Sequence, residues 1–399
     1  MIKVGTARSE YERMHSKRSE ALDRAEKAAR VTIPSLFPPE GHSRGNDLKD
    51  PYQSLGARAV NTLASKIMLA LFPPNTPFFS LGFDVETQAK LGQNDIDMGE
   101  IQSGLSLIEN AAVDELEATN MRPVMNTAVR LLIATGNTTI RVDDKGKFKV
   151  FTLRQYVVRR DPGGTVVDLI IHETVDPNTL STEIVDQILT DAEKQDMAKM
   201  DPVDIYTVMT REPGGRFKVW QEARDKMLDG TDGDYSEKTP PFLTRRWTEL
   251  PGEHYGRGMV DQYYGDFKAL DDLNRDLLKA SASAAKIIWM RNPGSMVSKR
   301  KLEKAEYGDI LVGNPEEVQA LTLDKFGDFQ VTLERIRDIR TELVEAFLMR
   351  STVQRDAERV TAEEIRFVAQ ELEDALGGVY SLLAQELQAP LARRWLKIA

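Results

Sequence analysis

The chain has 399 residues, of which 41% are hydrophobic and 29% charged, and its 53 lysines and arginines against 63 aspartates and glutamates give a formal net charge of −10. This length and apolar content can supply a substantial core shared among several structural units of about 150 residues each. The acidic balance argues against a protein that clamps nucleic acid through its overall charge, because affinity for phosphate comes from lysines and arginines that displace counterions.

Cysteine is absent, which excludes disulfides, thiolate nucleophiles and cysteine metal sites and is typical of a reducing compartment. The first 30 residues alternate charged and small apolar residues and lack the apolar core of a signal peptide. The longest strongly apolar run, Ile67–Phe72, is far shorter than the roughly 20 residues that span a bilayer. These features predict a soluble intracellular protein.

The first third of the chain predicts helices that end at prolines. Residues 8–30 are rich in helix formers and predict an exposed amphipathic helix. Residues 55–72 carry apolar side chains every three or four positions and predict a helix that Pro73 and Pro74 end. The same Leu-Phe-Pro-Pro stop occurs earlier, at residues 36–39. Further helices are expected over 94–119 and over 123–135, the second ending at Gly136.

The period then changes to that of strands. Runs rich in β-branched and aromatic residues predict strands over 138–142, 148–153, 156–160, 166–172, 205–211 and 217–222. Two Pro-Gly-Gly turns, at 161–164 and 212–215, predict hairpins. We expect a small antiparallel α+β unit, with a short helix over 182–198 and a loop over 229–241.

The last 140 residues predict long helices again. A helix is expected over 259–290, followed by strand and turn structure over 296–324, in which Ile310–Val312 is the best strand. A second long helix is expected over 327–349, and then a basic loop. Thr361 and Glu364 form a capping box that opens a third helix, and its apolar seam continues as far as Pro390.

The sequence contains few signs of catalytic chemistry. It has neither the Gly-Lys-Ser/Thr spacing of a phosphate-binding loop nor a Gly-x-Gly-x-x-Gly after a strand. The histidines are scattered and predict surface or packing roles: His15, His42, His172 and His254. A group of acids resembles a calcium loop but fails the spacing of such loops, and a solvated loop is the simpler interpretation: Asp229, Asp232, Asp234 and Glu237. We therefore expect no enzyme activity, no metal and no cofactor.

Two basic clusters are candidate contact sites. The first lies after the first long helix and comprises Lys299, Arg300, Lys301 and Lys304. The second lies in the loop between the second and third helices and comprises Arg350, Arg355 and Arg359. Either cluster can be a solvated surface, and the loop arginines can also form salt bridges between subunits with Asp356 or Glu358.

The two proline stops carry a more specific signal. Ser-Leu-Phe-Pro-Pro at 35–39 and Leu-Phe-Pro-Pro-x-x-x-Phe-Phe-x-Leu at 71–81 flank Gly-Ala-x-x-Val-Asn-x-Leu-Ala at 56–64. Tyr-Gly-Arg-Gly-Met at 255–259 and Arg-Val-Thr-Ala-Glu-Glu-Ile at 359–365 then open the first and third of the long helices. These motifs resemble those of the head-to-tail connector, or portal, proteins of short-tailed bacteriophages, and the resemblance covers nearly the whole chain.

The resemblance implies a mainly α member of the α+β class, the portal fold, assembled as a ring. Its implied parts are a wing (1–257), a first stem helix (258–290), a small α/β clip (291–325), a second stem helix (326–349), a tunnel loop (350–360) and a wing helix (361–399). Related connectors continue into a C-terminal crown, so the crown is expected to be truncated or absent after Ala399.

The implied function is a dodecameric ring at one capsid vertex, through which double-stranded DNA is packaged and ejected. Arg350, Arg355 and Arg359 would face the DNA, and the clip lysines and arginine would meet the terminase large subunit and the tail adaptor protein. The major capsid protein and scaffolding protein are further implied partners, with no membrane, in a virion assembled in the host cytoplasm. The alternatives are a ring-forming tail adaptor or scaffold without a packaging role, and a DNA-processing enzyme, for which no metal-binding carboxylate cluster is legible.

Overall fold

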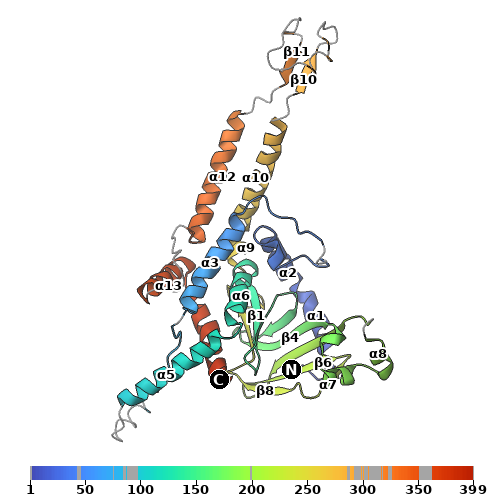
Figure 1. Cartoon of the computed structure of the whole chain (residues 1–399), viewed down its shortest axis with the longest axis vertical. Coiled ribbons are helices and arrows are strands. Elements are labelled where there is room, and N and C mark those ends of the chain that lie inside the picture. The colour runs from blue at the N-terminus through green and yellow to red at the C-terminus, as the bar shows by residue number, and fades with distance from the viewer. Residues whose placement is uncertain are drawn as a thin grey trace.

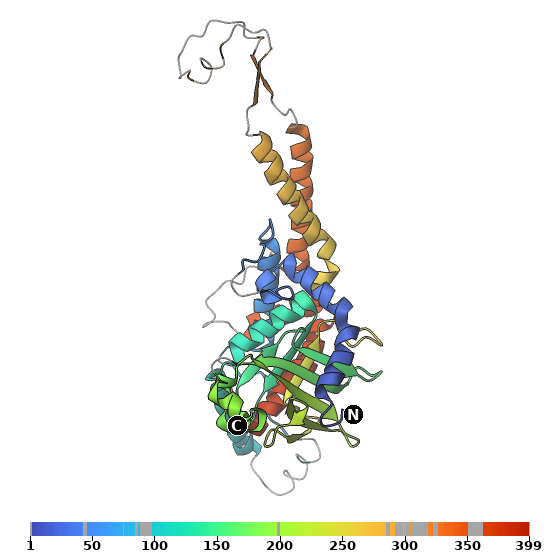
Figure 2. The same cartoon turned by 90° about the vertical axis from the view of Figure 1, so that its right-hand side faces the viewer.

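The computed structural model describes residues 2–42, 46–74, 76–83, 87, 98–197, 200–284, 288–291, 298, 300, 304, 316, 318–321, 326–349 and 362–398. Figure 1 and Figure 2 show a body of helices and antiparallel strands from which two long helices project side by side. The mixed class of helix and sheet, expected from the sequence, is confirmed.

The N-terminal segment forms α1 (Ala7–His15), a 3-10 turn (Ser16–Arg18) and α2 (Ser19–Arg30). The predicted amphipathic helix therefore exists, divided in two, and it is exposed along its polar face only. Its alanines, including Ala25 and Ala29, are buried, because small side chains let the helix approach the rest of the body closely. Arg18 is also buried and donates to the carbonyl oxygens of Leu153 (2.6 Å) and Arg154 (2.9 Å).

The central helices agree well with the prediction. They are α3 (Leu55–Leu71), α5 (Met98–Glu117) and α6 (Met121–Thr135). The apolar stripe of α3 is fully buried in the main core, together with the apolar face of α6. Gly136 ends α6 in the left-handed conformation (φ 76°), as its position predicted.

Strands form two sheets beside these helices. The first has the order β2-β1-β9, and the second has the path β3-β4-β5-β6-β7 with β8 also paired to β6. Their bounds are β1 (Asn137–Val142), β2 (Phe148–Phe151), β3 (Tyr156–Arg160), β4 (Val166–Val175), β5 (Val203–Arg211), β6 (Arg216–Ala223), β7 (Lys226–Met227), β8 (Gly233–Ser236) and β9 (Phe242–Arg246). Every pairing is antiparallel, and both Pro-Gly-Gly turns join the predicted hairpins.

Two predictions for this unit need correction. The expected helix over 182–198 is two helices, α7 (Thr182–Ile188) and α8 (Asp191–Gln195), because Thr190 and Glu193 form a capping box that starts a new helix. The expected loop over 229–241 contains β8, where Tyr235 lies opposite Phe217. Strand β9 was not predicted.

The projecting part is built from α9 (Met259–Gln262), α10 (Tyr264–Ala284) and α12 (Phe326–Ala346), with a hairpin of β10 (Ile288–Arg291) and β11 (Val318–Leu321) beyond the two long helices. The predicted helix over 259–290 ends too late. Ile288 and Trp289 instead pair with Leu321 and Ala320, as β-branched and aromatic residues favour. The predicted strand Ile310–Val312 lies outside the described residues.

The C-terminal segment returns to the body as α13 (Ala362–Leu376), α14 (Val379–Leu383), a π-helical turn (Ala384–Gln388) and α15 (Ala389–Ile398). The predicted seam is confirmed, since Val368, Leu372 and Leu387 are buried in the main core. The predicted end at Pro390 is wrong: this proline lies in the first turn of α15, where it is tolerated. Among the described residues, none of the helices has the length and hydropathy needed to cross a membrane.

Candidate functional site: the projecting helix pair and its base

The two predicted basic clusters fall mostly beyond what the structure describes. Arg350, Arg355 and Arg359 lie outside the described residues, and so do Lys299 and Lys301. The remaining two, Arg300 and Lys304, are described and exposed. Their roles therefore stay predictions, and the functional geometry that the structure describes is that of the helix pair α10 and α12, which lies next to both clusters in sequence.

The helix pair is antiparallel, because the chain leaves the body along α10 and returns along α12 (Figure 1). An apolar seam joins the helices near the body, where Phe267 meets Phe347 with ring centroids 5.4 Å apart. Leu270, Ile339 and Leu343 are buried in the same core. The lower part of the pair is thus continuous with the core of the body.

The outer part of the pair is much less covered. Leu278 on α10 is 60% exposed and Val331 on α12 is 69% exposed. Charges of both signs surround these positions, and the described side chains of the two helices include six basic and eight acidic residues: Lys268, Arg275, Lys279, Arg335, Arg337 and Arg340 against Asp266, Asp271, Asp272, Asp276, Glu334, Asp338, Glu342 and Glu345. The surface of the pair is therefore slightly acidic rather than a basic clamp.

Close backbone packing fixes the base of the pair, where the chain passes from β9 to α9. A Cβ atom on Gly136 would lie 2.4 Å from the amide nitrogen of Gly258, and one on Gly258 would lie 2.7 Å from the carbonyl oxygen of Ile133. The side chain of Asn137 donates to the carbonyl oxygen of Gly256 (2.9 Å) and accepts from its amide nitrogen (2.8 Å). The two glycines of the Tyr-Gly-Arg-Gly-Met motif therefore permit this close approach.

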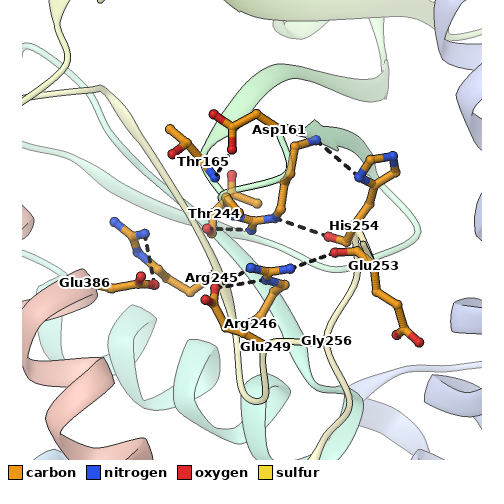
Figure 3. A network of polar contacts seen from close by, with 12 residues as sticks. Asp161, Thr165, Thr244, Arg245, Arg246, Glu249, Glu253, His254, Gly256 and Glu386 are labelled. Atoms are coloured by element: carbon orange, nitrogen blue, oxygen red, sulfur yellow. Dashed lines mark hydrogen bonds and ion pairs between the residues drawn. The ribbon is translucent and has the colours of Figure 1, made fainter. Parts of the chain in front are cut away.

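Two buried arginines hold the same segment. Arg160 donates to the carbonyl oxygens of His254 (3.2 Å), Gly164 (2.8 Å) and Thr244 (3.0 Å). Arg246 donates to the carbonyl oxygen of Glu253 (2.7 Å) and to the carboxylate of Glu249 (3.1 Å), as Figure 3 shows. These bonds tie the β3–β4 turn, β9 and the segment before α9 into one network. We call this network the arginine clamp.

Burial and neighbouring charges lower the pKa values of Arg160 in the clamp and of His254 beside it. Burial, together with the charges of Arg246 and Arg245, lowers the pKa of Arg160 to about 10. Burial and the nearby Arg160 also lower the pKa of His254, whose ring accepts from the amide nitrogen of Arg160 at 3.3 Å. Arg160 thus stays charged at neutral pH while His254 is held neutral, so the histidine has a packing role, as expected.

Arginines also complete the two Phe-Pro-Pro stops. After α3, the guanidinium of Arg122 donates to the carbonyl oxygens of Phe72 (3.1 Å) and Pro73 (3.2 Å). After the earlier stop, Arg154 donates to the carbonyl oxygen of Pro38 (2.9 Å), and its guanidinium carbon lies 4.7 Å from the ring centre of Phe37. Carbonyl groups within each stop thus accept hydrogen bonds from a side chain distant in sequence.

Two of the four acids at 229–237 form ordinary ion pairs. Asp234 pairs with Arg216 at 2.8 Å and Glu237 pairs with Arg211 at 2.5 Å. Throughout the described ranges, no three histidine, aspartate or glutamate side chains are placed so that they could hold a metal ion.

Among the other histidines, His172 contacts Asp204 at 2.8 Å and stacks on Tyr206, with ring centroids 4.9 Å apart.

Comparison with known proteins agrees with the motifs. The family model described as "Bacteriophage head to tail connecting protein" matches residues 4–399. The portal protein of Escherichia phage T7 is 36% identical over 397 residues, which covers 98% of this chain and 74% of that protein. The portal protein of Enterobacteria phage T3 is 36% identical over 396 residues, with the same coverage of both chains.

A solved structure, the neck of a native GTA particle, overlaps 72% of this chain and 71% of that chain at 11% identity and a TM-score of 0.35, a similarity too low to support an inference about the fold. The family assignment rests on the sequence matches, which extend over nearly the whole chain. The chain belongs to the family of bacteriophage head-to-tail connecting proteins.

Proposed function

We propose that this protein is a portal: a dodecameric ring at one capsid vertex that forms the channel for packaging and ejection of double-stranded DNA. The observation that carries this proposal is the match to phage portal proteins at 36% identity over 98% of the chain. The role is structural, with the motor activity supplied by a separate protein. We place the ring in the virion, after assembly in the host cytoplasm.

In this proposal α10 and α12 are the stem helices, residues 291–325 are the clip, and residues 350–360 are the tunnel loop. Residues 1–257 and 361–399 form the wing. The projection of α10 and α12 from a mixed body supports this division (Figure 2). The arginine clamp and the Gly136–Gly258 approach then set the direction of the stem relative to the wing.

The charge of the stem suits a channel through which DNA must slide. Each phosphate that a protein neutralises adds affinity, and strong affinity would hold the polyanion in place. The described side chains of α10 and α12 carry eight acids against six basic residues, so the pair offers DNA no basic track. Contact with DNA is assigned instead to Arg350, Arg355 and Arg359 of the tunnel loop.

Exposed apolar side chains support assembly with other subunits. Leu278 and Val331 project from the stem helices, and Phe367 on α13 is 65% exposed. Such side chains on several elements of one chain fit an assembly in which neighbours cover them. A closed ring needs two different faces per subunit, because each copy contacts the next one head to tail.

The clip is proposed as the docking platform for the terminase large subunit during packaging and for the tail adaptor protein afterwards. Lys299, Arg300, Lys301 and Lys304 are its proposed contacts. The wing would meet the major capsid protein and, during assembly, the scaffolding protein.

A packaging assay tests the channel role. Replacing Arg350, Arg355 and Arg359 together by alanine should reduce DNA packaging or retention, while purified rings stay intact in negative-stain images. Alanine replacement of Arg8, Arg13 and Arg216, three exposed arginines of the wing, is the matched control and should leave packaging unchanged. Wild-type packaging by the loop variant would remove the DNA role of these arginines, and rings without any packaging role would favour a tail adaptor or scaffold.

A further inference from the structure

A cavity beside the arginine clamp has features that neither the family nor the proposed channel explains. It measures about 220 Å³ and lies between the β3–β4 turn, β9 and the π-helical turn before α15. Its walls include Arg160, Thr165, Arg245, Glu237, Glu249 and Glu386. A water molecule occupies about 30 Å³ of liquid, so the cavity can hold a small polyatomic ion with some water.

Among these wall residues, Arg245 has a buried guanidinium group with few hydrogen-bond partners. Its side chain is only 17% exposed, yet its ion pair with Glu386 is long, at 3.5 Å (Figure 3). Its Nε atom is buried without a hydrogen-bond partner among the described residues. A guanidinium carries five N–H donors, so most of those of Arg245 remain available.

The other charges near the cavity are already paired. Glu249 accepts from Arg246, and Glu237 accepts from Arg211 at 2.5 Å. Within the described part of the chain, Arg160 donates only to carbonyl oxygens and has no carboxylate partner. Among the described residues, Arg160 and Arg245 therefore have one ion-pair partner between them, the carboxylate of Glu386 at 3.5 Å from Arg245.

We propose that this cavity binds a free oxyanion of the size of inorganic phosphate, held by the guanidinium groups of Arg245 and Arg160. The planar fork of a guanidinium matches an acceptor with two oxygens on one centre, which favours phosphate over chloride. Thr165 lies in the same wall and adds a hydroxyl group that can donate. Burial lowers the pKa of Arg245, and a bound anion would oppose that effect.

Calorimetric titration of the full chain with inorganic phosphate, in chloride buffer at constant ionic strength, tests this proposal. We expect saturable binding of one phosphate per chain. Arg245→Met should weaken it by at least about tenfold, which corresponds to the loss of about 1.4 kcal/mol of interaction. Arg216→Met, which removes an exposed arginine of β6, should leave it unchanged.

Glu386→Gln provides a second, opposite test. This variant removes the acceptor that competes for Arg245, so phosphate should bind more tightly than to the wild type, a gain that misfolding cannot mimic. Absence of saturable binding, equal binding by the wild type and Arg245→Met, or no gain in Glu386→Gln would each overturn the site.

A short DNA duplex should not compete with phosphate, because its backbone is too broad to enter a cavity of this size. Displacement of phosphate by the duplex would overturn the assignment to a free ion. Each of these readouts uses phosphate affinity alone, so the test does not depend on whether the chain forms a ring.

Discussion

The base and the outer part of the helix pair differ sharply in how closely each is packed against the rest of the same chain. At the base, Gly136 and Gly258 pack backbone against backbone, and Arg160 and Arg246 supply donors to the carbonyl groups of the adjoining segments. In the outer part, Leu278 and Val331 are exposed. Contacts within the single chain thus hold the helix pair at its base, whereas other chains would cover its outer surface only in the proposed ring.

The close approach at the base should be the most sensitive point. Gly136→Ala places a Cβ atom 2.4 Å from the amide nitrogen of Gly258 and also forces an alanine to φ 76°. We expect the free energy of unfolding, measured by urea titration, to fall on the order of 4 kcal/mol from strain and overpacking together.

Gly230→Ala separates these two causes. Gly230 has a similar φ of 74°, but a Cβ atom at this position would have no neighbour within 4 Å, so only the backbone strain applies. Its loss should be about 1 kcal/mol. Equal losses at the two glycines would show that the close approach contributes nothing.

The arginine clamp should be the next most sensitive point. Arg160→Met removes the donors of the carbonyl groups of Gly164, Thr244 and His254, and we expect a loss of about 3 kcal/mol in the free energy of unfolding. Arg216→Met, at an exposed pair with Asp234, should lose under about 0.5 kcal/mol. If Arg160→Met matched this control, the clamp would be irrelevant to stability.

The corner after α3 should show a smaller effect. Arg122→Met leaves the carbonyl groups of Phe72 and Pro73 without their donor, but this arginine is only partly buried and water can replace part of the bonding. A loss of about 2 kcal/mol is expected in the same titration. Arg13→Met, at an exposed arginine of α1, is the matched control, and an equal loss there would argue against the corner.

The outer part of the helix pair should respond in the opposite way. The double variant Leu278→Ser and Val331→Ser removes exposed apolar groups, so the unfolding of the single chain should change by less than about 0.5 kcal/mol. Ring formation, measured by sedimentation velocity, should nevertheless decrease. Rings of wild-type yield would show that these side chains are not subunit contacts.

Local patterns predicted most of the helices and hairpins. The apolar period of α3, the glycine after α6 and the two Pro-Gly-Gly turns each depend on residues close together in sequence, and each led to the observed element. Strand β9 was missed because its pairing with β1 joins residues about a hundred positions apart, as Thr139 and Thr244 illustrate. The end of α10 was placed too late for the same reason, since the pairing of β10 with β11 decides it.

The candidate functional residues divide in the same way, into those that a local sequence pattern marks and those that only contacts between distant residues reveal. Charge runs drew attention to the basic clusters around residues 300 and 355, which stay predictions. The arginines that organise the described structure, such as Arg18, Arg160 and Arg246, stand in unremarkable sequence surroundings. The Tyr-Gly-Arg-Gly-Met motif at 255–259 follows the segment that Arg160 and Arg246 hold, but the sequence analysis used it only as a family motif.

Electron microscopy of the purified chain tests the central claim most directly. The account predicts closed rings of about twelve subunits around a central hole, with α10 and α12 of each subunit lining it. A compact monomer, or a ring in which α10 and α12 point away from the hole, would contradict it.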